Sequence, residues 1–180
     1  MTADVTTVRG LGRDEGDLLG AIMVGLSPQS RYLRFHTPIT ELTPELRRVL
    51  LDVDGVRHLG LVAETGAGDP VGVASVFRNR QRPGEAEIAV AVVDAWQRRG
   101  VGRRLVTAAA ERARGLGVRR LTARVLPGNA AALGLFRSVF PVVLTSRDAD
   151  NLVLVALLGG PGGRSDWLIT ADGVIADLGA

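Results

Sequence analysis

The stretch that organises this chain runs Val92-Val93-Asp94-Ala95-Trp96-Gln97-Arg98-Arg99-Gly100-Val101-Gly102-Arg103-Arg104, near the middle of its 180 residues. It follows an apolar segment at residues 87–93 and leads into a segment whose apolar residues recur about every fourth position, the spacing of one helix face. Its two glycines remove the Cβ atoms that would keep an anion from the backbone where that helix begins. Unpaired N–H groups and the positive end of the helix dipole converge at the same place. The stretch therefore predicts a strand, an anion-binding loop and a helix in succession.

Two common nucleotide-binding loops do not fit this stretch. A dinucleotide-binding loop needs Gly-x-Gly-x-x-Gly, and a Walker loop needs Gly-Lys followed by Ser or Thr. The stretch has neither pattern, and the chain contains no lysine at all. Dinucleotides and nucleoside triphosphates are therefore poor candidates for the anion.

The pattern on both sides of the loop predicts an α/β fold of the α+β type. Thr43 and Pro44, an N-cap followed by proline at the first helical position, mark one helix start. The expected fold is a mixed, mostly antiparallel sheet of about seven strands with about four helices packed on it. Strands are expected at residues 5–9, 59–64, 71–77, 87–93, 121–126, 142–145 and 152–158, and helices at 13–25, 43–51, 101–116 and 129–139.

The domain organisation is read from a glycine-rich break near the C-terminus. Residues 1–158 are predicted to form one domain, and residues 159–180 a Gly-rich link and a hairpin-like tail. The tail is expected to add to the sheet edge, to cover the domain or to pair with a second copy in a homodimer. The first residues include an acid and no apolar run follows, so a cytoplasmic protein without a membrane span is expected.

Charge is distributed unevenly along the chain. All 22 cations are arginine against 19 acids, which gives a net charge of only +3 despite a pI of about 10.7. Residues 98–124 hold nine arginines and one acid, a net charge of +8, and the remainder is acidic. With only 4% aromatic residues, a nucleic-acid stacking surface is not expected, so the basic segment suits a small polyanion. The chain has no cysteine, and no metal site is expected.

The loop and the order of elements resemble the GNAT superfamily of acyl-CoA N-acyltransferases over residues 5–158. The family loop reads Gln/Arg-x-x-Gly-x-Gly/Ala, and residues 97–102 match it. The resemblance implies acetyl-CoA as co-substrate, with its pyrophosphate on the loop and its pantetheine arm along the preceding strand. It also places an asparagine near the pantetheine, at a position that serves equally well as a helix N-cap. The cofactor-binding residues implied are Val90, Ala91, Val92, Gln97, Arg98, Arg99, Gly100, Val101, Gly102, Arg103 and Asn129.

Acetyl transfer to an amine requires a base, and Glu87 is the predicted one. It begins the apolar run at residues 87–93, where a carboxylate is costly unless it is paired or used, and many members of the resembled family place the base on this strand. In the alternative interpretation, Glu85 and Glu87 are cross-strand partners of Arg78 or Arg80.

Other acid and base candidates are weaker. Asp94 fits a turn, and His36 and His58 are distant in sequence from the loop. The tyrosine with which many members of the resembled family protonate the departing thiolate is replaced by Phe136, which is expected in the core, as is Phe140. The role of this tyrosine is therefore unneeded, taken by water or moved to Ser138.

The acceptor is predicted from residues 26–35, interpreted as a connection between the first two helices. Together with residues 86–89 and 96–97 they resemble the GNAT domain of bacterial Pat-type protein-lysine acetyltransferases. The preferred acceptor is therefore the lysine of a protein. The alternatives are a small-molecule amine or amino acid, or a non-catalytic acyl-CoA-binding protein of the same fold.

Overall fold

The computed structural model describes residues 7–141 and 143–159. The strands are β1 (Thr7–Gly10), β2 (His58–Glu64), β3 (Pro70–Arg78), β4 (Glu85–Val92), β5 (Arg120–Val125), β6 (Val143–Asp148) and β7 (Asn151–Leu157). The helices are α1 (Gly16–Val24), α2 (Pro28–Phe35), α3 (Pro44–Leu51), α4 (Val101–Gly115) and α5 (Ala130–Val139), with a 3₁₀ turn, η1 (Asp94–Trp96), before α4. The predicted tail hairpin, at residues 167–176, lies outside the described residues.

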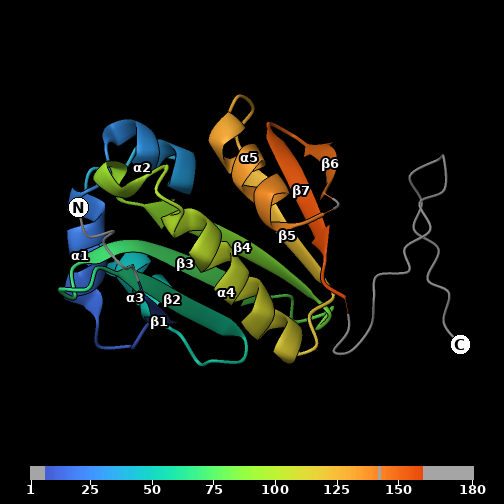
Figure 1. Ribbon diagram of the computed structural model, residues 1–180, viewed down its shortest axis with the longest axis horizontal. Helices are drawn as coiled ribbons and strands as arrows, with labels where there is room; N and C mark the ends of the chain where they lie inside the picture. Colours follow the sequence, from blue (N-terminus) through green and yellow to red (C-terminus); the bar gives the residue numbers. More distant parts are fainter. Residues whose placement is uncertain (1–6, 142, 160–180) are drawn as a thin grey trace, which may run out of the picture.

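The seven strands form one sheet in the order β1-β2-β3-β4-β5-β7-β6 (Figure 1). Every neighbouring pair is antiparallel except β4 and β5, which run parallel because α4 carries the chain back across the sheet between them. The predicted antiparallel meander of β2, β3 and β4 is confirmed, as is a mostly antiparallel sheet of about seven strands.

Helices cover both faces of the sheet, and each face has its own core. α4 and α5 pack on one face, where Leu105, Leu121 and Leu154 are fully buried. α1 and α3 pack on the other face against Val62 and Val73. Side chains alternate along β4, so Ile88 belongs to the first core and Ala91 to the second. The same alternation puts Glu87 and Ala89 on the face that carries α1 and α3.

The sheet opens between β4 and β5. These strands pair only from Glu85 to Glu87, opposite Arg120 to Thr122. Beyond Glu87, β4 continues to Val92 without pairing with β5, while β5 pairs with β7 along its other edge. A cavity of about 70 Å³ lies between the parted strands. The fold thus exposes polar backbone groups in the middle of a sheet, where a ligand can replace the missing partner strand.

The prediction of about four helices was one helix short, because α2 was interpreted as a connection. Ser27 caps it, accepting a hydrogen bond from the Ser30 N–H at 3.2 Å, and Pro28 occupies the first turn. This is the signal that correctly identified α3, where Thr43 accepts from the Leu46 N–H. It was missed in α2 because no described residue of that helix is fully buried, so an apolar periodicity is lacking.

Candidate functional site

The glycine loop lies between β4 and α4 and has the predicted strand, turn and helix order. Gly100 is the N-cap of α4 and has a φ of 84°, a left-handed conformation that glycine adopts without strain. Gly102 has a different reason to be glycine: a Cβ there would lie 3.2 Å from Cδ2 of Leu135 on α5. The first glycine therefore shapes the turn, and the second lets α4 and α5 approach each other.

The loop presents a row of unused hydrogen-bond donors. The first hydrogen bond of α4 runs from the Arg104 N–H to the Gly100 carbonyl. Within residues 7–141 and 143–159, no acceptor is found for the six backbone N–H groups of residues 98–103. Because the helix dipole adds positive potential at this end, the loop is built to hold an anion.

A groove of about 380 Å³ runs along this loop, between α2, the end of β4 and α5. It brings together nine of the eleven predicted cofactor-binding residues. They are Val90, Ala91, Val92, Gln97, Arg98, Gly100, Gly102, Arg103 and Asn129. The other two do not line it: Val101 is 1% exposed in the core, and the Arg99 guanidinium lies over the Trp96 ring at 5.2 Å.

Gln97 is committed to the loop itself. Its Nε2 donates to Ser30 Oγ, to the Val92 carbonyl and to Asp94 Oδ1 at 3.1 to 3.2 Å, so it ties β4, η1 and α2 together. Its backbone N–H donates to the Asp94 carbonyl at 3.2 Å. The anion donors therefore start at Arg98, and Gln97 holds the loop in shape. This also confirms Asp94 as a turn residue.

Only alternate residues of β4 turn their backbone toward the gap. The Val93 N–H donates to the Val71 carbonyl and the Asn79 N–H to the Glu85 carbonyl, which fixes the register of hydrogen-bonded pairs between β3 and β4. By the antiparallel alternation, Ala91 bonds to β3, whereas the N–H groups of Val90 and Val92 point toward β5. The Ala91 backbone groups are therefore used within the sheet, so Val90 and Val92 are the residues whose backbone can pair with a ligand in the gap, while Ala91 lines the groove.

Glu87 lies on the α1 and α3 face and is not buried. Its side chain is 46% exposed, and Arg124 Nε approaches its Oε2 at 3.6 Å. Glu85 pairs instead with Arg82 and Arg120, at 3.6 and 3.7 Å. The alternative that Arg78 or Arg80 pairs with these carboxylates is wrong, because the arginines that reach them stand on β5 and on the β3–β4 turn.

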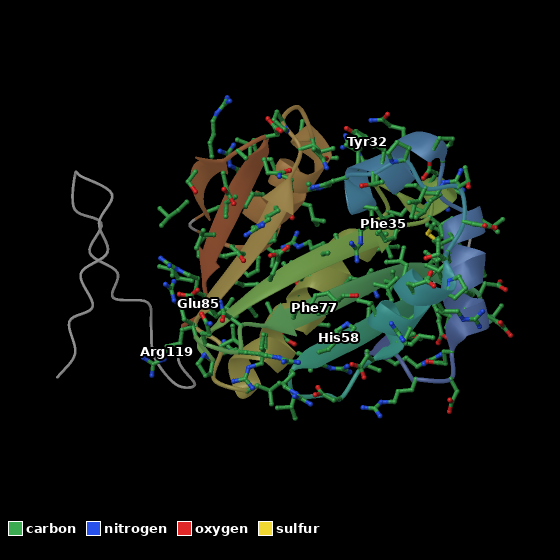
Figure 2. All side chains as sticks on the ribbon, turned by 180° about the vertical axis from the view of Figure 1, so that it is seen from behind. Tyr32, Phe35, His58, Phe77, Glu85 and Arg119 are labelled. Carbon is green, nitrogen blue, oxygen red and sulfur yellow. The ribbon has the colours of Figure 1, made fainter. Side chains whose placement is uncertain are left out.

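The two histidines differ in their surroundings. His36 ends α2 with a φ of 56°. His58 is buried and stacks on Phe77 at 4.1 Å, and Figure 2 shows the two rings together on the sheet. Burial lowers the pKa of His58, so it is neutral at pH 7. The strand register places His58, Phe77 and Glu87 in one row across the sheet, a neighbourhood that the sequence separation concealed.

The residues considered for the general acid are also located. Phe136 and Phe140 are core residues with ring centroids 4.9 Å apart, as predicted. Ser138 lines the groove, and its hydroxyl donates to the Leu135 carbonyl at 2.7 Å. In the part of the chain that the structure describes, no group of His, Asp or Glu is arranged to hold a metal ion. None of the described helices is long and apolar enough to cross a membrane.

The segment from which the acceptor was predicted, residues 26–35, contains α2 and forms one wall of the groove. Ser30, Leu33 and Arg34 of this helix line the groove. Arg34 is half-buried, and burial lowers its pKa to about 10 although the charge of Glu87 acts in the opposite direction. The cap signal at Ser27 and Pro28 could have shown that this wall is a helix and not a connection.

Comparison with known proteins agrees with this geometry. The model of the Acetyltransferase (GNAT) family matches residues 28–140, more than half of the chain. Acetyltransferase Pat from Mycolicibacterium smegmatis is 36% identical over 109 residues, which cover 60% of this chain and 32% of that protein. The chain thus spans about a third of the length of this relative.

Solved structures show the same fold. The GNAT domain of S. lividans PAT is 26% identical, with a TM-score of 0.78 over 87% of this chain and 97% of that domain. A GNAT superfamily phosphinothricin acetyltransferase from Sinorhizobium meliloti, solved in complex with AcCoA, is 18% identical with a TM-score of 0.67, and the match covers 88% and 92% of the two chains. The predicted resemblance is confirmed, and the chain belongs to the GNAT family of acetyltransferases.

Proposed function

We propose that this chain moves the acetyl group of acetyl-CoA to a primary amine, the lysine side chain of a protein, with Glu87 as general base. The observation that carries the proposal is the row of six unused N–H groups at residues 98–103, on the rim of a groove that continues into the β4–β5 gap. The phosphates of coenzyme A suit the N–H groups of residues 98–103, and its narrow pantetheine arm suits the groove and the gap. The name of the Pat relative and the AcCoA of the Sinorhizobium meliloti structure support this assignment.

The gap supplies a donor for the reacting carbonyl. The Val90 N–H points into it, where the thioester oxygen gains negative charge during attack. The neutral amine nitrogen forms a bond to the carbonyl carbon, and the bond from that carbon to sulfur breaks. The departing thiolate takes a proton from water, because Phe136 has no hydroxyl and the Ser138 hydroxyl donates to Leu135. The hydroxide that remains is neutralised by the proton that Glu87 takes from the amine.

Glu87 accepts the proton that the amine loses. Val90 lies three positions further along β4, about 10 Å of strand, so the proton passes through a bridging water. The half-exposed carboxylate is open to that water, and Arg124 holds it from the β5 side.

A thiol-release assay tests the proposed reaction. The chain has no cysteine and no lysine, so a thiol reagent detects only released coenzyme A and the enzyme offers no side-chain amine of its own. Thiol release is expected to require a lysine-containing protein, to match acetyl-lysine formation by mass spectrometry, and to stop when the acceptor's lysines are dimethylated. Binding of acetyl-CoA without release of thiol to any amine would instead support the non-catalytic alternative.

Asn129 allows a helix cap to be separated from a ligand contact. Its Oδ1 accepts from the Ala132 N–H at 3.0 Å, which confirms the cap, and its amide NH₂ remains for the pantetheine arm. Asn129→Ala is expected to lower the free energy of unfolding by about 1 kcal/mol, whereas Asn129→Ser keeps a capping oxygen and the stability. Both variants should bind acetyl-CoA about three- to tenfold more weakly in calorimetry. If Asn129→Ser bound acetyl-CoA with wild-type affinity, the role of Asn129 would be that of a helix cap alone.

A further inference from the structure

Arg34 occupies a central place on the acceptor side of the site. It lines the groove, the gap between β4 and β5, and a small interior cavity of about 20 Å³ under α1. In the gap it lies with Ala89, which shares a sheet face with Glu87. The guanidinium is held from one side by the ring of Phe35, whose centroid lies 4.9 Å from its Cζ. Figure 2 shows Phe35 on this side of the sheet, below Tyr32 of the same helix.

The Arg34 guanidinium makes no direct ion pair in the described part of the chain, although the charge of Glu87 acts on it from a longer distance. Its Nε is buried without a hydrogen-bond partner, and no ion pair to it is found among residues 7–141 and 143–159. A water in the 20 Å³ cavity would satisfy this Nε and the equally unpartnered Ser75 hydroxyl, but it would leave the guanidinium without a directly paired anion. A half-buried cation without a partner costs free energy, which favours a role in binding.

We propose that Arg34 binds a carboxylate of the acceptor, so that the acceptor's amine faces Glu87 while its carboxylate pairs with the guanidinium. The inference rests on the proposed function and adds the acceptor's chemistry to it. The planar fork of arginine matches a carboxylate with two parallel hydrogen bonds. The coenzyme is a less suitable partner, because its phosphates have the loop at residues 98–103, whereas Arg34 reaches the Glu87 face.

Two kinds of acceptor carry such a carboxylate, and matched pairs distinguish them. The first pair is a peptide whose lysine is flanked by glutamate and the same peptide with glutamine. The second pair is free lysine and its carboxamide, lysinamide. In the peptide pair, the carboxylate member is expected to have a kcat/KM about 10- to 100-fold higher, mainly through a lower KM. A difference confined to the free-lysine pair would support the carboxylate subsite and contradict the protein acceptor. Equal kcat/KM values within both pairs would overturn the proposal.

Variants then assign the preference to Arg34. Arg34→Met keeps the apolar stem and is expected to erase the preference by raising the acceptor KM, with the acetyl-CoA affinity unchanged. Arg34→Lys keeps the charge without the fork and should retain part of the preference. Arg48→Met, on the exposed side of α3, is the matched control and should behave like wild type. A preference for the carboxylate acceptor that survives in Arg34→Met would also overturn the proposal. If Arg34→Met does not fold, an undiminished preference in Arg34→Lys would overturn it instead.

Calorimetry separates failure of this inference from failure of the proposed reaction. Binding of each pair to the protein saturated with coenzyme A needs no turnover. Tighter binding of the carboxylate member, lost in Arg34→Met, is expected even if acetylation is slow. Acetylation of lysine without such a difference would contradict the carboxylate subsite alone, and no acetylation of any amine would contradict the proposed reaction.

Discussion

A Glu87→Gln variant is expected to bind acetyl-CoA as wild type does and to lose about 100- to 10,000-fold in kcat, the contribution of a positioned general base. The substitution keeps the size of the side chain and removes its ability to accept the amine proton. Folding should be little affected, because the side chain is 46% exposed and its contact with Arg124 is a half-exposed ion pair at 3.6 Å. The steady-state rate of thiol release with a lysine acceptor gives kcat, and calorimetry gives the affinity for acetyl-CoA.

Glu85→Gln provides the matched control for this variant. Glu85 stands two residues earlier on β4, on the same face. Its replacement also removes ion pairs, those with Arg82 on the β3–β4 turn and Arg120 on β5. It lies farther from the gap, so its kcat should stay within about twofold of wild type. A Glu87→Gln enzyme with undiminished turnover would mean that the proton leaves by another route, and neutral His58 in the same row of the sheet would be the next residue to test.

Local patterns predicted the parts of the site that a short stretch of chain can specify. The loop at residues 97–103 is contiguous, and glycine, helix periodicity and strand alternation all act within a few residues of it. The meander of β2, β3 and β4 was predictable for the same reason, because short turns join its strands. Asn129 was predictable as a cap because the capping bond spans only three residues.

Contacts between distant segments were not predictable in this way. Arg124 reaches Glu87 because β4 and β5 are parallel neighbours in the sheet, although a helix separates them in the sequence. The periodicity of neither strand indicates this pairing. The importance of Arg34 depends on where α2 lies relative to β4, and the apolar pattern of that helix is weak. The purpose of Gly102 likewise came from α5, since the sequence explained both glycines by the anion alone. Tertiary packing therefore gave these residues roles that their neighbours in sequence do not indicate.

Replacing Gly100 and Gly102 together by valine is expected to weaken acetyl-CoA binding by about 100-fold or more, measured by calorimetry or by protection against thermal unfolding. A β-branched residue does not tolerate the φ of 84° at Gly100, so the turn must rearrange and the N–H groups of residues 98–103 no longer converge. A Cβ at Gly102 would lie 3.2 Å from Cδ2 of Leu135, so this side chain on α5 must give way by a few tenths of an ångström and the wall of the groove changes shape.

The single variants separate backbone strain from loss of the anion site. Gly68 has a similar φ of 91° in the turn between β2 and β3, with open space around its Cβ position, as at Gly100. Gly68→Val therefore carries comparable strain away from the groove and should lower the free energy of unfolding while leaving acetyl-CoA affinity intact. Gly100→Val should lower both. If Gly100→Val kept its affinity while losing stability as Gly68→Val does, the loop N–H groups would not be the phosphate donors, because their convergence depends on the backbone at Gly100.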